Sequence, residues 1–510
     1  MTSVIEQNSP AAVGQGEDRA GTRASLPIVP FARPDIPDRD RDRLDAVAAR
    51  LLREEPALAA IAPFGERVTA GLSWYGRALA FEDHSGQALF ARRGAVPTEY
   101  RPLLLAGDGD FVAIGEQPDP AFEAYCREVL GLGRVERLFP APAQGTTVRL
   151  PHRLIHDTDA MNRLIETARR DTVISLIPYY GNGGCWVLGR EIAARSGARV
   201  RIAAAPPRLT RRVNDKLWFA DRVAELLGRT ARPMTYYAYG PSALATRLRT
   251  LARSYGRVIV KVPDSAGSLG NLAVGAEDIL SRTFVELRGW LIETLAGQHW
   301  DGGWPLLTGV WDSPAAGSPS VQTWIPAARD GTPIVEGIFE QVVEGPRGAF
   351  VGSIPADLPG RWTARLASEA ALLATLLQRL GYFGRCSFDA VLAGRSLDDA
   401  ELHWIECNGR WGGVSIPMTL ANRLTGNWRK RPFVVVQREA KPHRPLSVGQ
   451  AIARLGGRLF RPGPRGEGIV LLTPRLMSEG RGLHFMALAK TAGAARAMAA
   501  ECTTLLGAEN

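Results

Sequence analysis

The sequence is poor in lysine and cysteine and has no long apolar run. Of its 62 basic residues only five are lysine, namely Lys216, Lys261, Lys430, Lys441 and Lys490. Each lysine that remains in so arginine-rich a chain is a candidate for a specific role, although coding bias alone also explains the scarcity. The five cysteines have no CxxC spacing and the seven histidines have no ligand spacing, which argues against a disulfide scaffold and a zinc site.

Segments that would cross a membrane or direct secretion are also missing. No stretch approaches about 18 uncharged apolar residues, and the first residues have neither the basic nor the apolar region of a secretory signal. We therefore expect a cytoplasmic protein without a membrane partner. The formal charge is +10, but arginines are spread along the chain with acidic residues between them, so nucleic acid is not expected as a partner.

The length of the chain allows two or three domains, each with its own core. Apolar runs that alternate with helical patterns predict an α/β (α+β) fold. The expected order is a disordered arm at 1–42, an N-terminal family-specific region without recognisable chemistry at 43–165, a Rossmann-like unit at 166–212, a main module at 213–425 and a C-terminal α/β extension at 426–510.

The Rossmann-like unit is predicted from an apolar strand at 172–180, a glycine turn and a helix that ends at Gly197. The glycines of the turn do not have the GxGxxG spacing of a dinucleotide-binding loop. Beyond this unit, Asn214 is expected to cap a helix that stops at Gly228, and residues 278–296 are predicted to form one continuous helix.

Two predicted strands, 386–393 and 401–408, carry oxygen ligands for a candidate metal site. Glu406 and Asn408 project from one face because side chains alternate with period two along a strand. A hairpin between the strands would bring Asp389 opposite Glu406. Carboxylate and amide oxygens suit Mg²⁺. Taken alone, Glu406 is equally well explained as an exposed strand carboxylate.

The same alternation assigns faces to the other residues of the second strand. Leu402 and Trp404 are expected on the face of Glu406. His403 and Cys407 are expected to face away from Glu406 and to serve as packing residues.

Arg410 follows this strand directly and is itself followed by Gly412 and Gly413. A planar guanidinium suits phosphate, and glycines let the backbone turn closely around a ligand. The short distance along the chain therefore favours a phosphate contact next to the candidate metal site.

Lys261 lies in an apolar strand just before a loop that contains Gly267 and Gly270. Burying a lysine is costly without an anionic partner. A phosphate held under the backbone amides of the loop would supply that partner, although the loop lacks the GxxxxGK[ST] order of a P-loop. The alternative is an edge-strand lysine that reaches solvent. Lys216, near the start of a helix, is the weaker candidate when taken alone.

In order along the chain, Lys216, Lys261 with the loop DSAGSLGN, FDAVL and IECNGRWGG resemble the motif set of the ATP-grasp superfamily, over about 210–420. Three further segments more narrowly resemble the pre-ATP-grasp peptide ligases of the pheganomycin type, namely 318–326, 339–345 with its Gln341, and 352–359. The resemblance implies a Rossmann-like pre-ATP-grasp domain followed by a two-lobed ATP-grasp module, with an extra N-terminal region.

The superfamily pattern implies ATP and Mg²⁺ as cofactors. It makes Arg410 and Lys261 the catalytic residues and Asp389, Glu406 and Asn408 the metal ligands. The residues that it implies for binding the nucleotide are Lys216, Lys261, Asp264, Ser265, Gly267, Ser268, Gly270, Asn271, Gly309, Val310 and Trp311.

One departure from the superfamily concerns the hinge expected near 306–311. Many relatives have an acidic residue there that holds the ribose, whereas this sequence has Thr308 and Gly309. The departure leaves the ribose contact and the nucleotide preference open.

The predicted function is an ATP- and Mg²⁺-dependent carboxylate-amine ligase that forms an amide or peptide bond through an acyl phosphate. The resemblance implies an amino acid or peptide as substrate, in natural-product biosynthesis. An ATP-grasp carboxylase, a phosphotransferase and a non-catalytic nucleotide-binding scaffold are the alternatives. The expected partners are small-molecule or peptide substrates, a carboxylate and an amine, and the oligomeric state is open, with a homodimer as one option.

Overall fold

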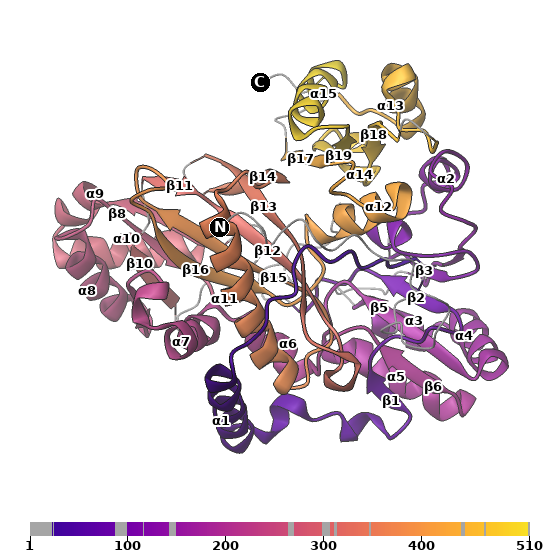
Figure 1. Cartoon of the computed structure of the whole chain (residues 1–510), viewed down its shortest axis with the longest axis horizontal. Helices are drawn as coiled ribbons and strands as arrows, with labels where there is room; N and C mark the ends of the chain where they lie inside the picture. The colour runs from indigo at the N-terminus through magenta and orange to yellow at the C-terminus, as the bar shows by residue number, and fades with distance from the viewer. Residues whose placement is uncertain are drawn as a thin grey trace.

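A computed structural model describes residues 23, 25–86, 99–115, 117–141, 149–263, 270–297, 306–310, 314–345, 348–439, 444–463 and 466–507. These residues form three sheets with helices packed against them, in a mixed α/β architecture (Figure 1). Within the described ranges, none of the helices has the length and apolarity needed to cross a bilayer.

The N-terminal region is a six-stranded parallel sheet with the order β1-β6-β5-β2-β3-β4. Its strands are β1 (Val68–Ala70), β2 (Ala78–Phe81), β3 (Phe111–Ala113), β4 (Glu136–Leu138), β5 (Val173–Pro178) and β6 (Arg199–Ile202). The helices that share one core with these strands are α3 (Leu150–His156), α4 (Thr158–Asp171) and α5 (Gly183–Ser196). The prediction that the helix after β5 ends at Gly197 is confirmed, because Gly197 adopts the left-handed conformation that closes α5.

Two predicted boundaries in this half of the chain are wrong. The Rossmann-like sheet is not confined to 166–212, because β1 to β4 from the region 43–165 complete it. The expected disordered arm at 1–42 contains ordered structure from residue 25 onward, since Leu26 is buried, Ala32 bridges to Val335 and α1 (Asp38–Glu54) begins inside the charge run. Acidic residues in the first turn of α1 favour a helix start there.

A four-stranded antiparallel sheet forms the smaller lobe of the second half (Figure 1). Its order is β7-β10-β8-β9, with β7 (Thr235–Ala238), β10 (Leu306–Val310), β8 (Arg257–Lys261) and β9 (Asn271–Gly275). Helices α8 (Gly240–Ala252), α9 (Ala276–Leu280) and α10 (Phe284–Ala296) pack on one face of it. The predicted continuous helix at 278–296 is therefore wrong: Thr283 and Glu286 form a capping box that starts α10 as a separate helix.

A nine-stranded sheet forms the larger lobe, with the order β11-β15-β12-β13-β14-β17-β19-β18 and with β16 paired to β15. The strands are β11 (Ala315–Gly317), β12 (Pro319–Ile325), β13 (Ile334–Glu344), β14 (Ala349–Pro355), β15 (Gly384–Ala393), β16 (Glu401–Asn408), β17 (Phe433–Glu439), β18 (Gly468–Leu471) and β19 (Gly482–Leu488). Helix α11 (Gly360–Arg379) packs on one face, and Cys407 is buried in that core with its Sγ 3.5 Å from Cys386 Sγ. The predicted C-terminal extension is thus partly a continuation of this sheet.

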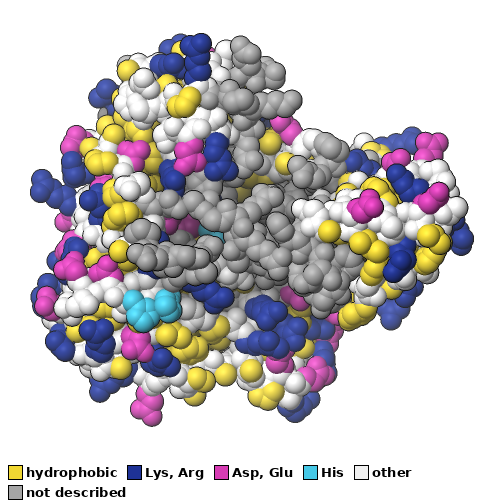
Figure 2. Space-filling model, turned by 180° about the vertical axis from the view of Figure 1, so that it is seen from behind, with side chains coloured by type: hydrophobic (Ala, Val, Ile, Leu, Met, Phe, Trp, Pro, Cys, Tyr) yellow, Lys and Arg dark blue, Asp and Glu magenta, His cyan; other side chains and the backbone are white. Residues whose placement is uncertain are grey.

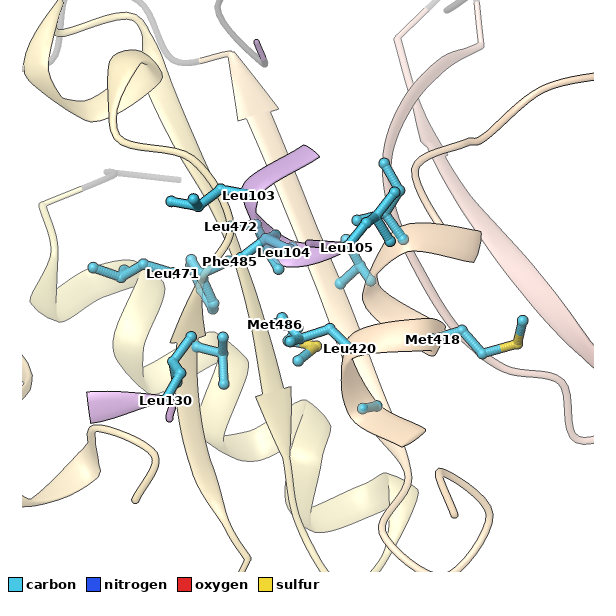
Figure 3. Close-up of a cluster of buried hydrophobic side chains, with 14 of the residues drawn as sticks. Leu103, Leu104, Leu105, Leu130, Met418, Leu420, Leu471, Leu472, Phe485 and Met486 are labelled. Carbon is cyan, nitrogen blue, oxygen red and sulfur yellow. The ribbon is translucent and has the colours of Figure 1, made fainter. Parts of the chain in front are cut away.

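One apolar core joins the C-terminal strands to the N-terminal region. Figure 3 shows Leu103 and Leu104, which follow Arg101 in a short 3₁₀ helix, next to Leu472 of the C-terminal segment and Leu420 of α12 (Ser415–Thr425). Helix α15 (Ala492–Leu505) also contributes to this core and packs on β17 and β19. The N-terminal and C-terminal parts of the chain are therefore held against each other next to Arg101.

Candidate active site

The candidate metal ligands lie on two paired strands of the large sheet. β15 and β16 are antiparallel, and their register pairs Asp389 with Glu406 and Ser387 with Asn408. Residues directly opposite each other share a face of the sheet. The three side chains of Asp389, Glu406 and Asn408 therefore project from one face, as predicted, and their role as metal ligands stays a prediction.

A bulge in β16 changes which neighbours share this face. Asp389 pairs with Glu406, whereas the next residue of β15, Ala390, pairs with Trp404, so that Ile405 is an extra residue. One extra residue reverses the alternation of side chains beyond it. Because of the bulge, Glu406 projects from one face of the sheet, and Leu402 and Trp404 project from the other.

Two predictions about β16 are wrong because of this bulge. Leu402 and Trp404 do not share the face of Glu406; they lie in the core beneath α11. His403 does not face away from Glu406, since it pairs with Val391 and so lies on the same face.

Asp389 is hydrogen-bonded on both of its carboxylate oxygens. Ser320 Oγ donates to Oδ1 over 2.6 Å, and Asn408 Nδ2 donates to Oδ2 over 2.9 Å. Burial, and after it the negative charge of Glu406, raise the pKa of Asp389 to about 6. Two carboxylates held together in this way are destabilised by like-charge repulsion, which a divalent cation relieves.

The donor set is small. Within the described ranges, no group of three or more His, Cys, Asp and Glu residues is arranged to hold a metal ion. The candidate set has two carboxylates and one amide, Asp389, Glu406 and Asn408. A set of this kind suits Mg²⁺, because Mg²⁺ keeps waters and substrate phosphates among its ligands and needs only one or two carboxylates from the protein.

Lys216 connects the metal face to the smaller lobe. It is the first residue of α7 (Lys216–Leu227), and its Nζ lies 3.3 Å from Glu406 Oε2 with only 3% of the side chain exposed. Its backbone N–H donates to Pro263 O over 3.2 Å, directly before the glycine-rich loop. A buried cation is therefore held between the carboxylates and the start of that loop.

Lys261 lies on the face of the small sheet that its helices leave open. Val260 belongs to the core beneath α8 and α10, so Lys261, the next residue, projects from the other face. Asn271 pairs directly with Lys261, and its Oδ1 is buried without a hydrogen-bond partner. Gly309 shares this face, whereas Val310 pairs with Val258 on the face of the helices.

Arg410 is held by a side chain that the sequence analysis assigned differently. Asn214 Oδ1 accepts from Arg410 Nη1 over 2.6 Å and from Gly409 N over 3.2 Å. The predicted helix-capping role of Asn214 is wrong, because the side chain of Asp215 caps α7. A Cβ at Gly409 would lie 2.3 Å from Val213, so this close approach requires glycine.

The Nε atom of Arg410 is buried and has no hydrogen-bond partner. Burial would lower the pKa of this guanidinium, but Tyr179 and Glu406 outweigh burial and raise it. A charged donor without a partner is expensive to bury, and an anion in front of Nε would remove that cost.

Several residues that were assigned to nucleotide binding lie outside the described ranges. They are Asp264, Ser265, Gly267, Ser268 and Trp311. Gly270, at the end of the loop, accepts a hydrogen bond from Val262 N over 3.0 Å.

Sequence reasoning missed a buried charged cluster at the carboxyl end of β2. Glu82 accepts from Arg101 Nε over 3.1 Å and lies 2.6 Å from His84 Nε2. Burial would raise the pKa of Glu82, but Arg101 and His84 outweigh burial and bring it to about 2. The signal in the sequence is a run of polar residues, Glu82 to Ser85, immediately after a fully apolar strand.

The same edge of the parallel sheet faces Arg410. From β2 the chain continues to β3 and β4 on one side of the sheet, and it then crosses to β5 and β6 on the other side of β2. The boundary between β2 and β5 is therefore a topological switch point. Ligands of open α/β sheets bind outside the carboxyl ends of strands at such a point. Tyr179 follows β5 there; its carbonyl accepts from Trp411 N over 3.1 Å, and its ring lies 4.6 Å from the guanidinium of Arg101.

His484 is a second residue that the sequence analysis missed. It lies in β19 with 1% of its surface exposed, and neither ring nitrogen has a hydrogen-bond partner. Burial, and after it the positive charge of Arg101, lower the pKa of His484 to about 3. The side chain is therefore neutral near the charged cluster of the N-terminal region.

Comparisons with known proteins agree with this architecture. The family model described as Pre ATP-grasp domain matches residues 99–194. No curated protein matches the chain.

Solved structures share the fold at low sequence identity. The chain is similar to an ADP complex of N5-carboxyaminoimidazole ribonucleotide synthetase, with a TM-score of 0.50 and 12% identity, over 84% of this chain and 96% of that chain. It is also similar to biotin carboxylase from Campylobacter jejuni, with a TM-score of 0.49 and 14% identity, over 82% and 88% of the two chains. A third similar structure, N5-carboxyaminoimidazole ribonucleotide synthetase from Thermus thermophilus, has a TM-score of 0.47 and 16% identity, over 84% and 98%.

Proposed function

We propose that this chain, which has the ATP-grasp fold with a pre-ATP-grasp domain, is an ATP- and Mg²⁺-dependent ligase that joins a carboxylate to an amine. The observation that supports this proposal most is one face of the large sheet. There the paired carboxylates of Asp389 and Glu406 meet the buried ammonium of Lys216, and Arg410 follows two residues after Asn408.

The residues fit a magnesium ion. Asp389, Glu406 and Asn408 would hold it, because their side chains share a face and because burial, and after it the charge of Glu406, raise the pKa of Asp389. The ion would neutralise that repulsion and leave positions for phosphate oxygens.

The residues also fit a nucleotide. Lys216, which lies beside Glu406, and Lys261, which pairs with Asn271 on the open face of the small sheet, would bind its phosphates.

When bound, ATP and Mg²⁺ supply the phosphoryl group that converts the substrate carboxylate into an acyl phosphate, from which the amine displaces phosphate to form the amide. The protein contributes position and charge to this chemistry rather than a covalent nucleophile. Arg410 would stabilise negative charge on the transferred phosphoryl group through its Nε, while Asn214 holds its Nη1.

An amino acid or peptide is the substrate class that we propose. Two of the segments with the narrower resemblance supply side chains at Asp389: Ser320 donates to it, and a hydrogen bond from Gln341 lowers its pKa against the effect of burial. The polar edge of the N-terminal sheet, with Arg101 and Tyr179, would form the other side of the substrate site.

The experiment that tests the proposal measures ADP release with a panel of amino acids and short peptides, with and without hydroxylamine. An acyl phosphate is trapped by hydroxylamine as a hydroxamate, which mass spectrometry detects. Glu406→Gln should lower substrate-dependent ADP release by about 10²–10³-fold, the usual cost of losing one group that stabilises transition-state charge.

The matched control is Glu401→Gln, which changes an exposed carboxylate on the same strand. It should retain the wild-type rate. Wild-type turnover in Glu406→Gln would overturn the metal assignment, and ADP release without hydroxamate in any reaction would overturn the acyl phosphate.

A carboxylase is the second candidate, in which bicarbonate is the carboxylate and the amine becomes carboxylated. The fold similarity to N5-carboxyaminoimidazole ribonucleotide synthetase favours it. ADP release that requires bicarbonate in CO₂-depleted buffer, with an amine as the sole other substrate, would replace the amide ligase with this function. A stable phosphorylated product would instead indicate a phosphotransferase.

A further inference from the structure

A cavity of about 450 Å³ lies between the N-terminal sheet and the large sheet, away from the candidate active site. One wall is the loop 71–75, which joins β1 to β2, and another is formed by Arg199 and Arg201 of β6. Trp324 and Arg329 of the larger lobe line the opposite side. The volume lies in the range of small-molecule sites, which is about 300–1,000 Å³. Figure 2 shows that Lys and Arg side chains are spread over the face of the molecule seen from behind, with Asp and Glu side chains among them.

The lengths of two strands, β5 and β12, give the distance between the cavity and the active site. β5 begins at Val173 in the cavity and ends next to Tyr179, which is about 20 Å away at about 3.3 Å per residue. β12 contributes Ser320 to the active site and Trp324 to the cavity. The two sites therefore lie at opposite ends of the same strands.

Positive charge in the cavity exceeds the negative charge that is available to balance it. Three guanidinium groups line it, those of Arg199, Arg201 and Arg329. Of the lining acids, Asp330 lies 3.6 Å from Arg329, and Asp171 is already paired with Arg170, outside the cavity, at 2.8 Å.

Arg199 and Arg201 are the least compensated of these cations. Among the described residues, the side chain of Arg199 has no hydrogen bond or ion pair. Arg201 donates only to the hydroxyl of Thr69. Burial, and after it the charges of Arg329 and Arg199, lower the pKa of Arg201. Arg199 and Arg329 are exposed, so solvent screens their repulsion, but three guanidinium groups around one cavity still favour the approach of an anion.

Aromatic side chains stand at the same opening. Trp74 is 44% exposed and Tyr75 is 78% exposed. The loop that carries them is bracketed by two glycines with positive φ, Gly71 and Gly76, and a Cβ at Gly76 would lie 2.4 Å from Val173 O. The backbone is thus shaped to present two large apolar rings to solvent beside a group of cations, an arrangement that binds flat rings with charged substituents.

We propose that this cavity is a second binding site, which takes a small organic anion carrying a carboxylate or a phosphate next to a flat ring. Arg199 and Arg201 bind the anionic group, and Trp74 and Tyr75 cover the ring. The site is separate from the ligation centre and does not depend on the reaction assigned there.

Calorimetric titration of the full chain with phenyl phosphate, benzoate and inorganic phosphate tests the proposal. Phenyl phosphate or benzoate should bind more tightly than inorganic phosphate, and whichever binds more tightly identifies the anionic group. The double variant Arg199→Ala/Arg201→Ala should weaken binding of the aromatic anion at least about tenfold, which corresponds to about 1.4 kcal/mol. Trp74→Ala should weaken the aromatic anions and leave inorganic phosphate unchanged.

Two further variants keep the test decisive. Arg201→Lys retains the charge and should retain most of the affinity, so a loss in the alanine variant is not a failure to fold. Arg195→Ala, an exposed arginine at the end of α5, is the matched control and should bind as the wild type does.

Three results would overturn the proposal. One is the absence of binding by all three probes, and a second is equal binding in the double variant. The third is displacement of the aromatic anion by ATP together with its loss in Lys216→Ala, which would place it in the ligation centre. A short single-stranded oligonucleotide that bound about tenfold more tightly through the same arginines would replace the small molecule with a nucleic acid.

Discussion

Two clusters of acids and cations, one at the N-terminal sheet and one on the large sheet, differ in how completely their charges are compensated. At the carboxyl end of β2, Glu82 is saturated by Arg101 and His84, and its pKa lies at about 2. On the large sheet, Asp389 faces Glu406, and its pKa is raised to about 6. The carboxylate of the first cluster has two partners within the protein, whereas the second cluster is the one that we propose binds a further cation.

This difference separates a structural charge cluster from a ligand site more clearly than burial does, because both clusters are largely buried. In the first, one carboxylate has two cationic or hydrogen-bonding partners. In the second, Lys216 is paired with Glu406, Asp389 lies opposite Glu406, and Arg410 keeps a buried Nε without a hydrogen-bond partner. Incomplete compensation is what perturbs pKa values at functional sites.

The comparison predicts its largest effect for the saturated cluster. Glu82→Gln should lower the free energy of unfolding by about 3–5 kcal/mol, because it leaves Arg101 buried without a counter-charge. Urea denaturation measures the change. Glu54→Gln, which removes an exposed partner of Arg50, is the control and should cost less than about 1 kcal/mol. Equal costs for the two variants would remove the distinction between the clusters.

For the uncompensated cluster the effect should fall on activity. Arg410→Met should lower kcat by about 10²–10³-fold, equal to about 2.7–4 kcal/mol of transition-state stabilisation. ADP release at saturating ATP measures it. Arg454→Met, on the exposed face of α13 (Val448–Leu455), is the control and should leave kcat unchanged. Full turnover in Arg410→Met would mean that the Nε of Arg410, which has no hydrogen-bond partner in the protein, does not contribute to catalysis.

His484 sharpens the comparison through pH. Its folded-state pKa is about 3, and the ordinary value in an unfolded chain is about 6.5. Between these values the unfolded state takes up a proton that the folded state does not, so the stability contributed by neutral His484 is complete above about pH 6.5 and decreases as pH falls. Between pH 7 and pH 5 the loss is about 2 kcal/mol.

His484→Leu should therefore remove about 2 kcal/mol of the acid sensitivity of unfolding over that interval. Denaturant titrations at pH 7 and pH 5 measure the difference between the variant and the wild type. His152→Gln changes an exposed histidine and should leave the acid sensitivity as it is. An unchanged pH dependence in His484→Leu would show that the histidine is protonated in the folded protein.

The smallest effect concerns the metal-free protein. Asp389→Asn should raise its free energy of unfolding by about 1 kcal/mol near pH 7, because the variant removes a negative charge that burial, and after it Glu406, disfavour. Addition of Mg²⁺ should then raise the melting temperature of the wild type and leave that of the variant unchanged. Destabilisation by Asp389→Asn without Mg²⁺ would contradict the proposal that Asp389 and Glu406 form a cation-binding site.

The candidate site was largely predictable because its residues are close in sequence and lie on regular strands. Asp389 and Glu406 needed only a short hairpin to face each other, and the structure pairs them. The bulge at Ile405 was not predictable from periodicity, since one extra residue leaves no mark in an apolar pattern, and it reversed the faces assigned to Trp404 and His403.

The N-terminal sheet was harder to predict for a different reason. β1, β2, β3 and β4 have three or four residues each, too few to show a period. Their pairing with β5 and β6 connects residues far apart in the chain. The contact between polar residues such as Glu82 and Arg101 could therefore not be predicted, because it depends on which strands lie side by side.

By itself the sequence determined the local chemistry: a carboxylate and an amide two residues apart on a strand, an aspartate one strand earlier and an arginine directly after, since alternation and short hairpins are local properties. Only the tertiary structure decided which distant groups join them. Asn214 holds Arg410, Lys216 reaches Glu406, and His484 approaches Arg101 because packing of three sheets, rather than any pattern within one segment, brings these side chains together.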